Sequence, residues 1–384
     1  MSATPDVAPR RIGAVRAATG SAAPELGRET SDTIRAARVL CILFMMTVHV
    51  WPGTRRILDA DSGPILDPLF AVVVGAIGLS SVPLLSYFSG LLFHRTLRAR
   101  GAGLGVIGAK ARTLLWPMVF WSIPMLAVIV AEDVIRTGSV SPEGGALYWA
   151  QMILGFGEGP ANSPLHFFRD IFVMCVYVTG LVLLCRISRP LAAVAWLAVC
   201  AFELRMGMSL MARDHIFLFF TAGLAMGHLG RANWRPGPWL ALLALAAYSG
   251  AAVSGALDAS PGGHWGGLAI STGERLAVSL AMFVAAAWAA GRTNALRRAL
   301  FWLEARIFTI FCSHMLTISV FGGLAFALGW SENDLWYPVI FAVQIAACVV
   351  VGIVLQPLLS WIPYVTGREA GPAGQRAPAA RAGA

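Results

Sequence analysis

Charged residues are scarce in this chain of 384 residues: they make up 13% of it, against 57% hydrophobic residues, and the mean hydropathy is +0.70. A soluble domain of this size needs more polar surface than that to face water, so the composition excludes an ordinary soluble globular protein. Runs of about 20 apolar residues, the length that a bilayer core demands, recur along the chain instead. The sequence also lacks a long polar block in which a separate soluble domain could fold. We therefore expect one membrane domain.

Cysteine pairs and a leader segment are missing as well. The six cysteines form no C-x-x-C pair and lie within or at the edge of apolar runs, so neither a disulfide framework nor a metal site is indicated. The N-terminal stretch has no apolar segment of the kind that a cleaved signal peptide needs, and we expect none. Residues 1–31 and 366–384 are expected to be disordered cytoplasmic tails that flank a folded domain of residues 32–365.

The apolar runs predict an all-α, polytopic transmembrane helical bundle of about ten helices. Residues 145–156 are apolar but too short to span a bilayer, so they are predicted to form an interfacial or re-entrant segment. The ten predicted helices cover residues 34–52, 69–95, 110–131, 166–186, 190–205, 213–230, 238–255, 267–291, 304–328 and 335–362.

The net charge of +9 is distributed unevenly between the predicted loops. With the N-terminus in the cytoplasm and an even number of helices, 22 of the 29 basic residues fall in cytoplasmic segments, and 14 of the 20 acidic residues fall on the opposite side. This is the positive-inside bias of membrane proteins, and it places both termini in the cytoplasm. The basic charge therefore indicates orientation in a membrane and not a surface for nucleic acid.

A histidine lies deep in the first predicted helix. Arg38 and His49 are about 16 Å apart along a helix axis. If Arg38 reaches the cytoplasmic face, His49 lies at or just beyond the middle of a bilayer core that is about 30 Å thick. An ionisable group at that depth indicates function, and a neutral imidazole can act as a general base. The alternatives are a histidine hydrogen-bonded between helices and one at the outer interface beside Trp51.

A second polar cluster lies near the end of the next predicted helix, where Ser89 and Gly90 precede Arg95 and Arg98. The two arginines share a helical face, and paired guanidiniums suit a phosphate-rich ligand. Ser89 and Gly90 are small enough to let another helix, or an arm of a ligand, approach closely. The alternative for the arginines is ordinary positive-inside charge.

Together with two further motifs, these features resemble the acyltransferase-3 family of membrane O-acyltransferases. The resemblance covers residues 32–362, nearly the whole predicted folded part. In the motif that begins at Leu165, His166 stands where the family more often has tryptophan. The motifs that carry the resemblance are Arg38-x10-His49, Ser89-Gly90-x-x-Phe93, Arg95-x-x-Arg98, Phe308-Thr-Ile-Phe-Cys-Ser313-His314 and Leu165-His166-Phe-Phe-Arg169-Asp170.

The resemblance implies a multi-pass enzyme of the bacterial inner membrane. Such enzymes take an acyl group, usually acetyl, from cytoplasmic acyl-CoA as a co-substrate and place it on a hydroxyl of an extracytoplasmic or lipid-linked sugar. No tightly bound cofactor is implied. The expected partners are the lipid bilayer, a glycan acceptor and polysaccharide assembly machinery. Exopolysaccharide is the acceptor that we expect first, with lipopolysaccharide and periplasmic glucan also open.

The resemblance also implies roles for single residues. His49 matches the catalytic histidine, and Arg38 matches its cytoplasmic partner. The His49 imidazole would either deprotonate the sugar hydroxyl or briefly accept the acyl group. Arg95 and Arg98 match the arginines that meet the phosphates of the coenzyme, and Arg112 lies where a third cation would help to hold them.

The oxyanion donor that attack on a thioester requires is left open. Ser89, Ser313 and His314 are the candidates. Ser313 and His314 are also predicted to be catalytic residues, because they lie in the motif that begins at Phe308.

His166, Arg169 and Asp170 are expected to bind the acceptor; the alternative for Arg169 and Asp170 is that they pair with each other at a helix start. Glu304 and Arg306 are expected to form a local ion pair outside the site.

A transporter or flippase for a lipid-linked sugar is the main rival interpretation, because buried polar residues and kinked helices suit it too. Transporters often contain internal repeats with paired broken helices, and the two halves of this sequence show no convincing self-similarity. A membrane sensor or scaffold is the third interpretation, and it predicts that His49, Arg95 and Arg98 tolerate alanine.

Overall fold

The computed structural model describes residues 26–50, 71–139, 145–155, 160–205, 211, 213–253, 263–329 and 337–367. Within these ranges the chain folds into helices and turns without a β-strand, which confirms the all-α prediction. The outer parts of both predicted tails, residues 1–25 and 368–384, lie outside the described residues.

A helix occupies each of the ten predicted ranges, and the short helix α7 lies where an interfacial segment is predicted. The elements are α1 (Arg28–Thr47), the π-helix η1 (Ala71–Gly78), α4 (Leu79–Arg100), α5 (Leu104–Lys110), the π-helix η2 (Ala111–Leu115), α6 (Trp116–Thr137), α7 (Gly145–Leu154), the 3-10 helix η3 (Ser163–Leu165), α8 (His166–Ile187), α9 (Arg189–Arg205), α10 (Asp214–His228), α11 (Pro238–Val253), α12 (Gly263–Ala290), α13 (Ala295–Glu304), α14 (Ile307–Ala327) and α15 (Tyr337–Leu359).

Six helical stretches among the described residues are long and apolar enough to cross a membrane. These stretches indicate a multi-pass membrane protein, while the count of ten spanning helices and the cytoplasmic placement of both termini stay predictions. The six stretches are Val72–Arg100, Leu104–Ile135, Ser163–Ile187, Gly267–Ala290, Ile307–Ala325 and Val339–Leu359.

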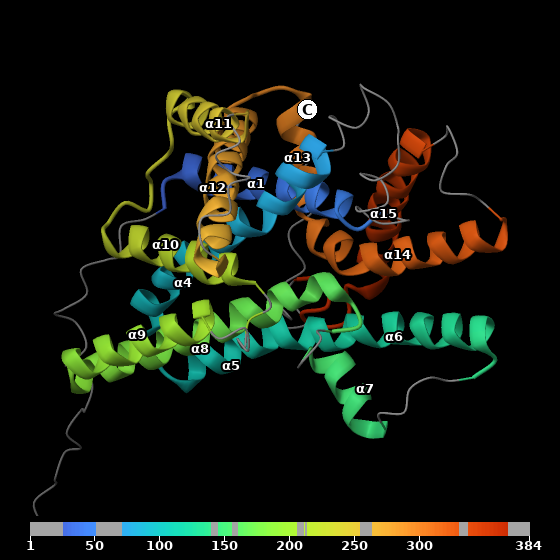
Figure 1. Cartoon of the computed structure of the whole chain (residues 1–384), viewed down its shortest axis with the longest axis horizontal. Coiled ribbons are helices and arrows are strands. Elements are labelled where there is room, and N and C mark those ends of the chain that lie inside the picture. The colour runs from blue at the N-terminus through green and yellow to red at the C-terminus, as the bar shows by residue number, and fades with distance from the viewer. Residues whose placement is uncertain are drawn as a thin grey trace, which may run out of the picture.

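The helices pack as neighbouring groups (Figure 1). Helices α8 and α9 lie beside the continuous run of α5, η2 and α6 at the bottom of the view. Helices α11 and α12 stand together, and α14 packs on both α15 and α6.

Helix α1 begins six residues earlier than the sequence predicts, at Arg28, and ends at Thr47. Its first turn is held by distant residues: Asn233 accepts a hydrogen bond from the Gly27 amide at 2.8 Å, and Arg235 pairs with Glu29 at 2.8 Å. Residues 28–31, which the composition assigns to a tail, are therefore part of the folded domain because tertiary contacts hold them.

Helix α13 lies where the sequence predicts a loop. Asn294 caps it by accepting a hydrogen bond from the Leu296 amide at 3.2 Å, and Leu300 faces the core. Arg297 ties the helix to α1 through an ion pair with Asp32 at 2.9 Å. The helix was missed because it is too short and too charged to register as an apolar run.

Helices α4 and α10 approach so closely that their backbones touch. A Cβ atom added at Gly90 would lie 2.0 Å from the carbonyl oxygen of Phe220, and one added at Gly223 would lie 1.9 Å from that of Tyr87. Of the two roles predicted for Gly90, close approach of a helix is the one that the structure shows.

Candidate active site

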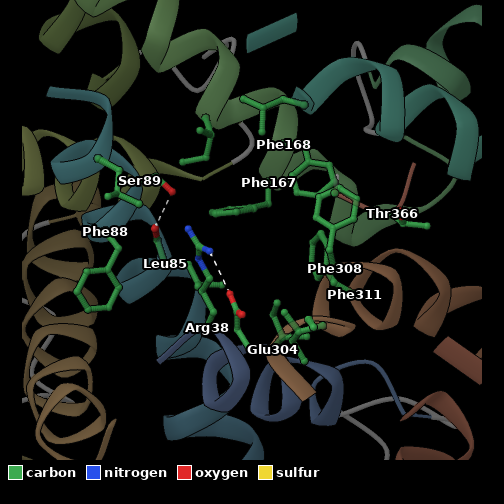
Figure 2. Close-up of a pocket in the computed structure, with 17 residues that line it drawn as sticks. Arg38, Leu85, Phe88, Ser89, Phe167, Phe168, Glu304, Phe308, Phe311 and Thr366 are labelled. Atoms are coloured by element: carbon green, nitrogen blue, oxygen red, sulfur yellow. Dashed lines mark hydrogen bonds and ion pairs between the residues drawn. The ribbon is translucent and has the colours of Figure 1, made fainter. Parts of the chain in front are cut away.

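A cavity of about 450 Å³, called the main cavity here because it contains Arg38, lies between α1, α4, α8 and the junction of α13 with α14 (Figure 2). This volume falls in the range of about 300–1,000 Å³ that is typical of small-molecule sites. Its polar side chains are Arg38, Ser89, Glu304 and Thr366, and the remaining wall is apolar, with five phenylalanines among aliphatic residues. The aromatic residues are Phe88, Phe167, Phe168, Phe308 and Phe311. A second cavity of about 460 Å³ lies between α4, α10 and α12 and contains none of the predicted site residues.

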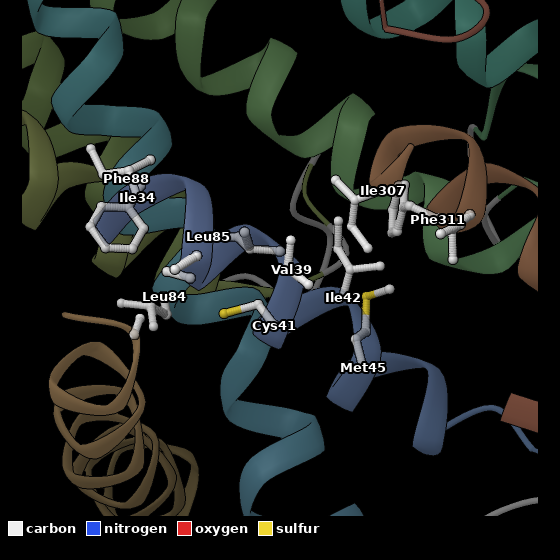
Figure 3. Close-up of a cluster of buried hydrophobic side chains, with 14 of the residues drawn as sticks. Ile34, Val39, Cys41, Ile42, Met45, Leu84, Leu85, Phe88, Ile307 and Phe311 are labelled. Atoms are coloured by element: carbon white, nitrogen blue, oxygen red, sulfur yellow. The ribbon is translucent and has the colours of Figure 1, made fainter. Parts of the chain in front are cut away.

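Helix α1 is buried between α4 on one side and α14 on the other (Figure 3). Val39, Cys41 and Met46 are fully buried, which is unusual for a helix that also carries several charges in its first half. Apolar positions around most of its circumference explain why α1 lies inside the bundle and can carry site residues.

Arg38 lies on one face of α1, and His49 lies about three helical turns further along the chain, in the turn that follows the helix. Arg38 and Ile42 on this face line the main cavity. One to two turns further on, Met45 and His49 line a second, smaller hollow, here the histidine pocket. Phe167 of α8 lines both hollows and separates them.

Ion pairs hold the Arg38 end of the main cavity. The Glu304 carboxylate lies 3.2 Å from Arg35 and 3.6 Å from Arg38, and Asp32 pairs with both Arg35 and Arg297. These pairs fasten the α13–α14 junction to α1.

The predicted local pair of Glu304 with Arg306 is wrong. Arg306 instead donates a hydrogen bond to the carbonyl of Trp302 at 2.6 Å and stacks 3.9 Å above that ring. Glu304 ends α13 and Arg306 lies in the turn before α14, and the Glu304 carboxylate turns instead to Arg35 and Arg38 on α1. Glu304 therefore lies in the wall of the main cavity and not outside the site.

His49 follows the end of α1, where its amide donates to the carbonyl of Met46 at 3.0 Å. Its ring lies against that of His314 on α14, with centroids 5.5 Å apart. The structure therefore brings together two histidines that are 265 positions apart in the sequence.

His314 is fully buried. Its Nδ1 lies 2.5 Å from the carbonyl oxygen of Phe311, which makes Nδ1 the donor of that hydrogen bond. Its Nε2 is then an unprotonated acceptor, and it has no hydrogen-bond partner. The neighbouring Ser313 is also fully buried, and its hydroxyl has no partner either.

The histidine pocket contains a second polar pair. His166 bonds through Nδ1 to the carbonyl of Ser163, and its Nε2 accepts a hydrogen bond from Nε of Arg213 at 3.2 Å. His49, His166 and Arg213 all line this pocket. Arg213 was not predicted as a site residue; the signal that could have found it is a basic residue on the side of the membrane where basic residues are rare.

Arg169 and Asp170 pair with each other. Both are buried, and the Asp170 carboxylate accepts from Nε and Nη2 of Arg169 at 3.0 and 2.9 Å. Arg169 also donates to the carbonyl of Gly155. Neither side chain lines the two hollows, so their expected contact with an acceptor stays a prediction.

Asn162 is a further buried polar residue that the sequence did not indicate. It donates to the carbonyl of Cys312 at 2.9 Å and so fixes the part of α14 that carries Ser313 and His314. A single asparagine in a loop has no motif by which to find it.

Of the residues predicted to bind the coenzyme, some line the main cavity and others do not. Ser89 lines the main cavity, with its hydroxyl donating to the carbonyl of Leu85 at 2.8 Å. Arg95, Arg98 and Arg112 do not line it, and the last two are exposed. Their contact with coenzyme phosphates therefore stays a prediction.

Among the described residues, no group of three or more His, Cys, Asp or Glu side chains is placed to hold a metal ion.

Comparison with known proteins gives one family and one relative. The profile of the acyltransferase-3 family, described as an acyltransferase domain, matches residues 32–355. The succinoglycan biosynthesis protein ExoH of Rhizobium meliloti (strain 1021) is 27% identical over 203 residues, which are 50% of this chain and 53% of that protein. The chain thus spans about half the length of that relative. No solved structure matches it.

Proposed function

Because the chain belongs to the acyltransferase-3 family, we propose that it is a membrane O-acyltransferase for a polysaccharide acceptor. It takes an acyl group, in the first place acetyl, from cytoplasmic acyl-CoA and transfers it to a hydroxyl of an extracytoplasmic or lipid-linked polysaccharide. The similarity to a protein of succinoglycan biosynthesis supports polysaccharide as the acceptor class and exopolysaccharide as the first choice.

The observation that carries the proposal is that α1 and the turn after it connect Arg38, in the main cavity, to His49 in the histidine pocket. The nucleotide of the donor is polyanionic and would stay at the end of the main cavity where Arg38 lies, with Arg35 nearby. The neutral pantetheine arm is thin enough to lie along the aromatic wall of the main cavity. Phe167 would have to change its rotamer for the thioester to reach His49.

His49 is the general base in the proposed reaction. Its imidazole takes the proton of the acceptor hydroxyl while that oxygen attacks the thioester carbonyl carbon. The tetrahedral intermediate collapses with cleavage of the carbon–sulfur bond, and the thiolate takes the proton back from the imidazolium to leave as free CoA. The acyl group stays on the acceptor as an ester.

The remaining polar groups of the site have supporting roles in this proposal. The guanidinium of Arg213, oriented by His166, supplies hydrogen bonds to the oxyanion. The unprotonated Nε2 of His314 has no partner among the described residues and lies on the ring next to His49, so we assign it as the acceptor that holds the His49 imidazole in the reactive orientation once the substrates are bound.

Transfer of label from acetyl-CoA by the purified protein in lipid nanodiscs tests the proposal. We expect His49→Ala to lose about 100-fold or more of the transfer rate, as is typical when a general base is removed, while CoA still binds. His228→Ala is the matched control, because His228 is an exposed histidine at the end of α10.

Wild-type protein without any CoA-dependent transfer would contradict the proposal. If a His49→Ala strain then still accumulated the surface glycan normally, the transporter interpretation would be favoured instead.

A further inference from the structure

The second cavity is a groove at the surface of the bundle. Helices α10 and α12 both pack on α4, but their described parts make little contact with each other, and the groove lies between them over α4. Ala222 of α10 and Leu276 of α12 line the groove and are exposed, so it is open to the outside. Since α4 and α12 belong to stretches that are long and apolar enough to cross a membrane, the opening lies at the depth of the lipid chains.

The wall of the groove is apolar along most of its length. On α12 the wall extends from Thr272 to Phe283, a distance of about 16 Å along the helix axis. The hydrocarbon of one leaflet, half of a bilayer core, is about 15 Å thick. The Ser279 hydroxyl donates to the carbonyl of Ser80 at 3.2 Å, and the Thr272 hydroxyl is buried, so neither is offered to an occupant. The groove therefore has the length and the polarity that suit an acyl chain of one leaflet.

A basic residue and a tryptophan lie at the Phe283 end of the groove. Arg231 and Trp234 line it there, from the loop after α10, and the Trp234 ring lies 6.5 Å from that of Phe283. Arg231 is exposed and makes no ion pair within the described part of the chain, whereas Arg235 in the same loop pairs with Glu29 at 2.8 Å. Tryptophan and arginine are typical of the head-group level of a membrane, and the predicted orientation places this loop on the cytoplasmic side.

We propose that the second cavity binds an acyl chain of an anionic phospholipid, such as phosphatidylglycerol, whose phosphate lies on Arg231. The guanidinium attracts the phosphate, and the apolar length of the groove takes the chain. An ammonium head group would need a carboxylate beside it, and no acidic residue among those described lines the groove. The bound lipid would join α10 to α12 where the two helices do not pack on each other.

Two other occupants fit less well. A helix is about 10–12 Å wide, so a groove of about 460 Å³ is too small for a helix of a partner protein. The polyprenyl chain of a lipid-linked acceptor is thin enough, but its glycan lies on the extracytoplasmic side in the proposed function, and Arg231 is predicted on the cytoplasmic side.

Native mass spectrometry of the delipidated full-length protein, titrated with lipids that have identical chains, tests the head-group contact. We expect the first phosphatidylglycerol to bind wild type about five- to tenfold more tightly than phosphatidylethanolamine, the effect of one arginine near the membrane surface. Arg231→Gln should lose this preference and bind both lipids as wild type binds phosphatidylethanolamine. Arg189→Gln is the matched control, because Arg189 is an exposed arginine at the start of α9 that lines neither cavity.

A second pair of variants tests the place of the chain. Ala222→Phe puts a ring into the groove and should weaken the binding of both lipids about tenfold or more, since the chain loses its buried apolar contact. Ala225→Phe is the control, because Ala225 is exposed on the same helix and lies outside the groove.

The opposite results are equally definite. Equal affinity of wild type for the two lipids, an Arg231→Gln protein that keeps the preference, or unchanged binding in Ala222→Phe overturns the inference. Displacement of phosphatidylglycerol by an equal concentration of a polyprenyl phosphate would assign the groove to the acceptor lipid, and a dimer that excludes the lipid would assign it to a second copy of the chain. Either result overturns the phospholipid as the occupant.

Discussion

Substitution of Gly90 by alanine should destabilise the protein by separating α4 from α10. The added Cβ would lie 2.0 Å from the carbonyl oxygen of Phe220 and 3.0 Å from the amide nitrogen of Leu224. Both are backbone atoms, which cannot rotate away as a side chain can. Ordinary contact begins at 3.4 Å, so the helices would have to separate locally by about 1.4 Å.

The size of the effect follows from two opposing terms. Overpacking of a buried contact costs typically about 1–3 kcal/mol, and a clash between rigid backbones belongs at the upper end. Alanine stabilises a helix interior by about 1 kcal/mol relative to glycine, which offsets part of this cost. The net loss expected for Gly90→Ala is therefore about 2 kcal/mol of the free energy of unfolding.

Unfolding titrations of the purified protein in detergent micelles measure this loss directly. The matched control is Gly180→Ala, because Gly180 lies on the exposed face of α8 with nothing within 4 Å of an added Cβ. The control should be as stable as wild type or up to about 1 kcal/mol more stable. Gly90→Ala protein with wild-type stability and a raised KM for acyl-CoA would refute the packing argument and return Gly90 to the donor site.

Three other substitutions test the ion pairs and hydrogen bonds around the cavities. Glu304→Gln removes a carboxylate that competes with the donor phosphates for Arg38, so the KM for acetyl-CoA should fall about two- to fivefold, in line with about 0.5–1 kcal/mol for a partly exposed pair; an unchanged or higher KM contradicts this. Asp170→Asn leaves the buried Arg169 without its carboxylate and should cost about 3–5 kcal/mol of the free energy of unfolding, whereas a loss below about 1 kcal/mol would show that the pair is not structural. Asn162→Ala leaves the buried Cys312 carbonyl without its partner and should cost about 1–3 kcal/mol, and an unfolding curve identical to that of wild type speaks against it.

The sequence determined the fold class and the approximate position of every predicted helix, because apolar runs must be as long as a bilayer is thick. It failed where charge outweighs hydropathy. The first turn of α1 is polar and α13 is a short helix with three charged residues, and they are held by Asn233, Arg235 and Asp32 from elsewhere in the chain.

For the site, the sequence pointed to His49 because an ionisable residue inside an apolar run is costly, and to Arg38 and His314 because they lie in motifs that resemble those of the family. Only the tertiary structure decided what meets there. It paired His49 with His314, added Arg213 through His166, and joined Glu304 to Arg38. Such contacts depend on how helices pack. Packing brings together residues hundreds of positions apart, and no local sequence pattern predicts these contacts.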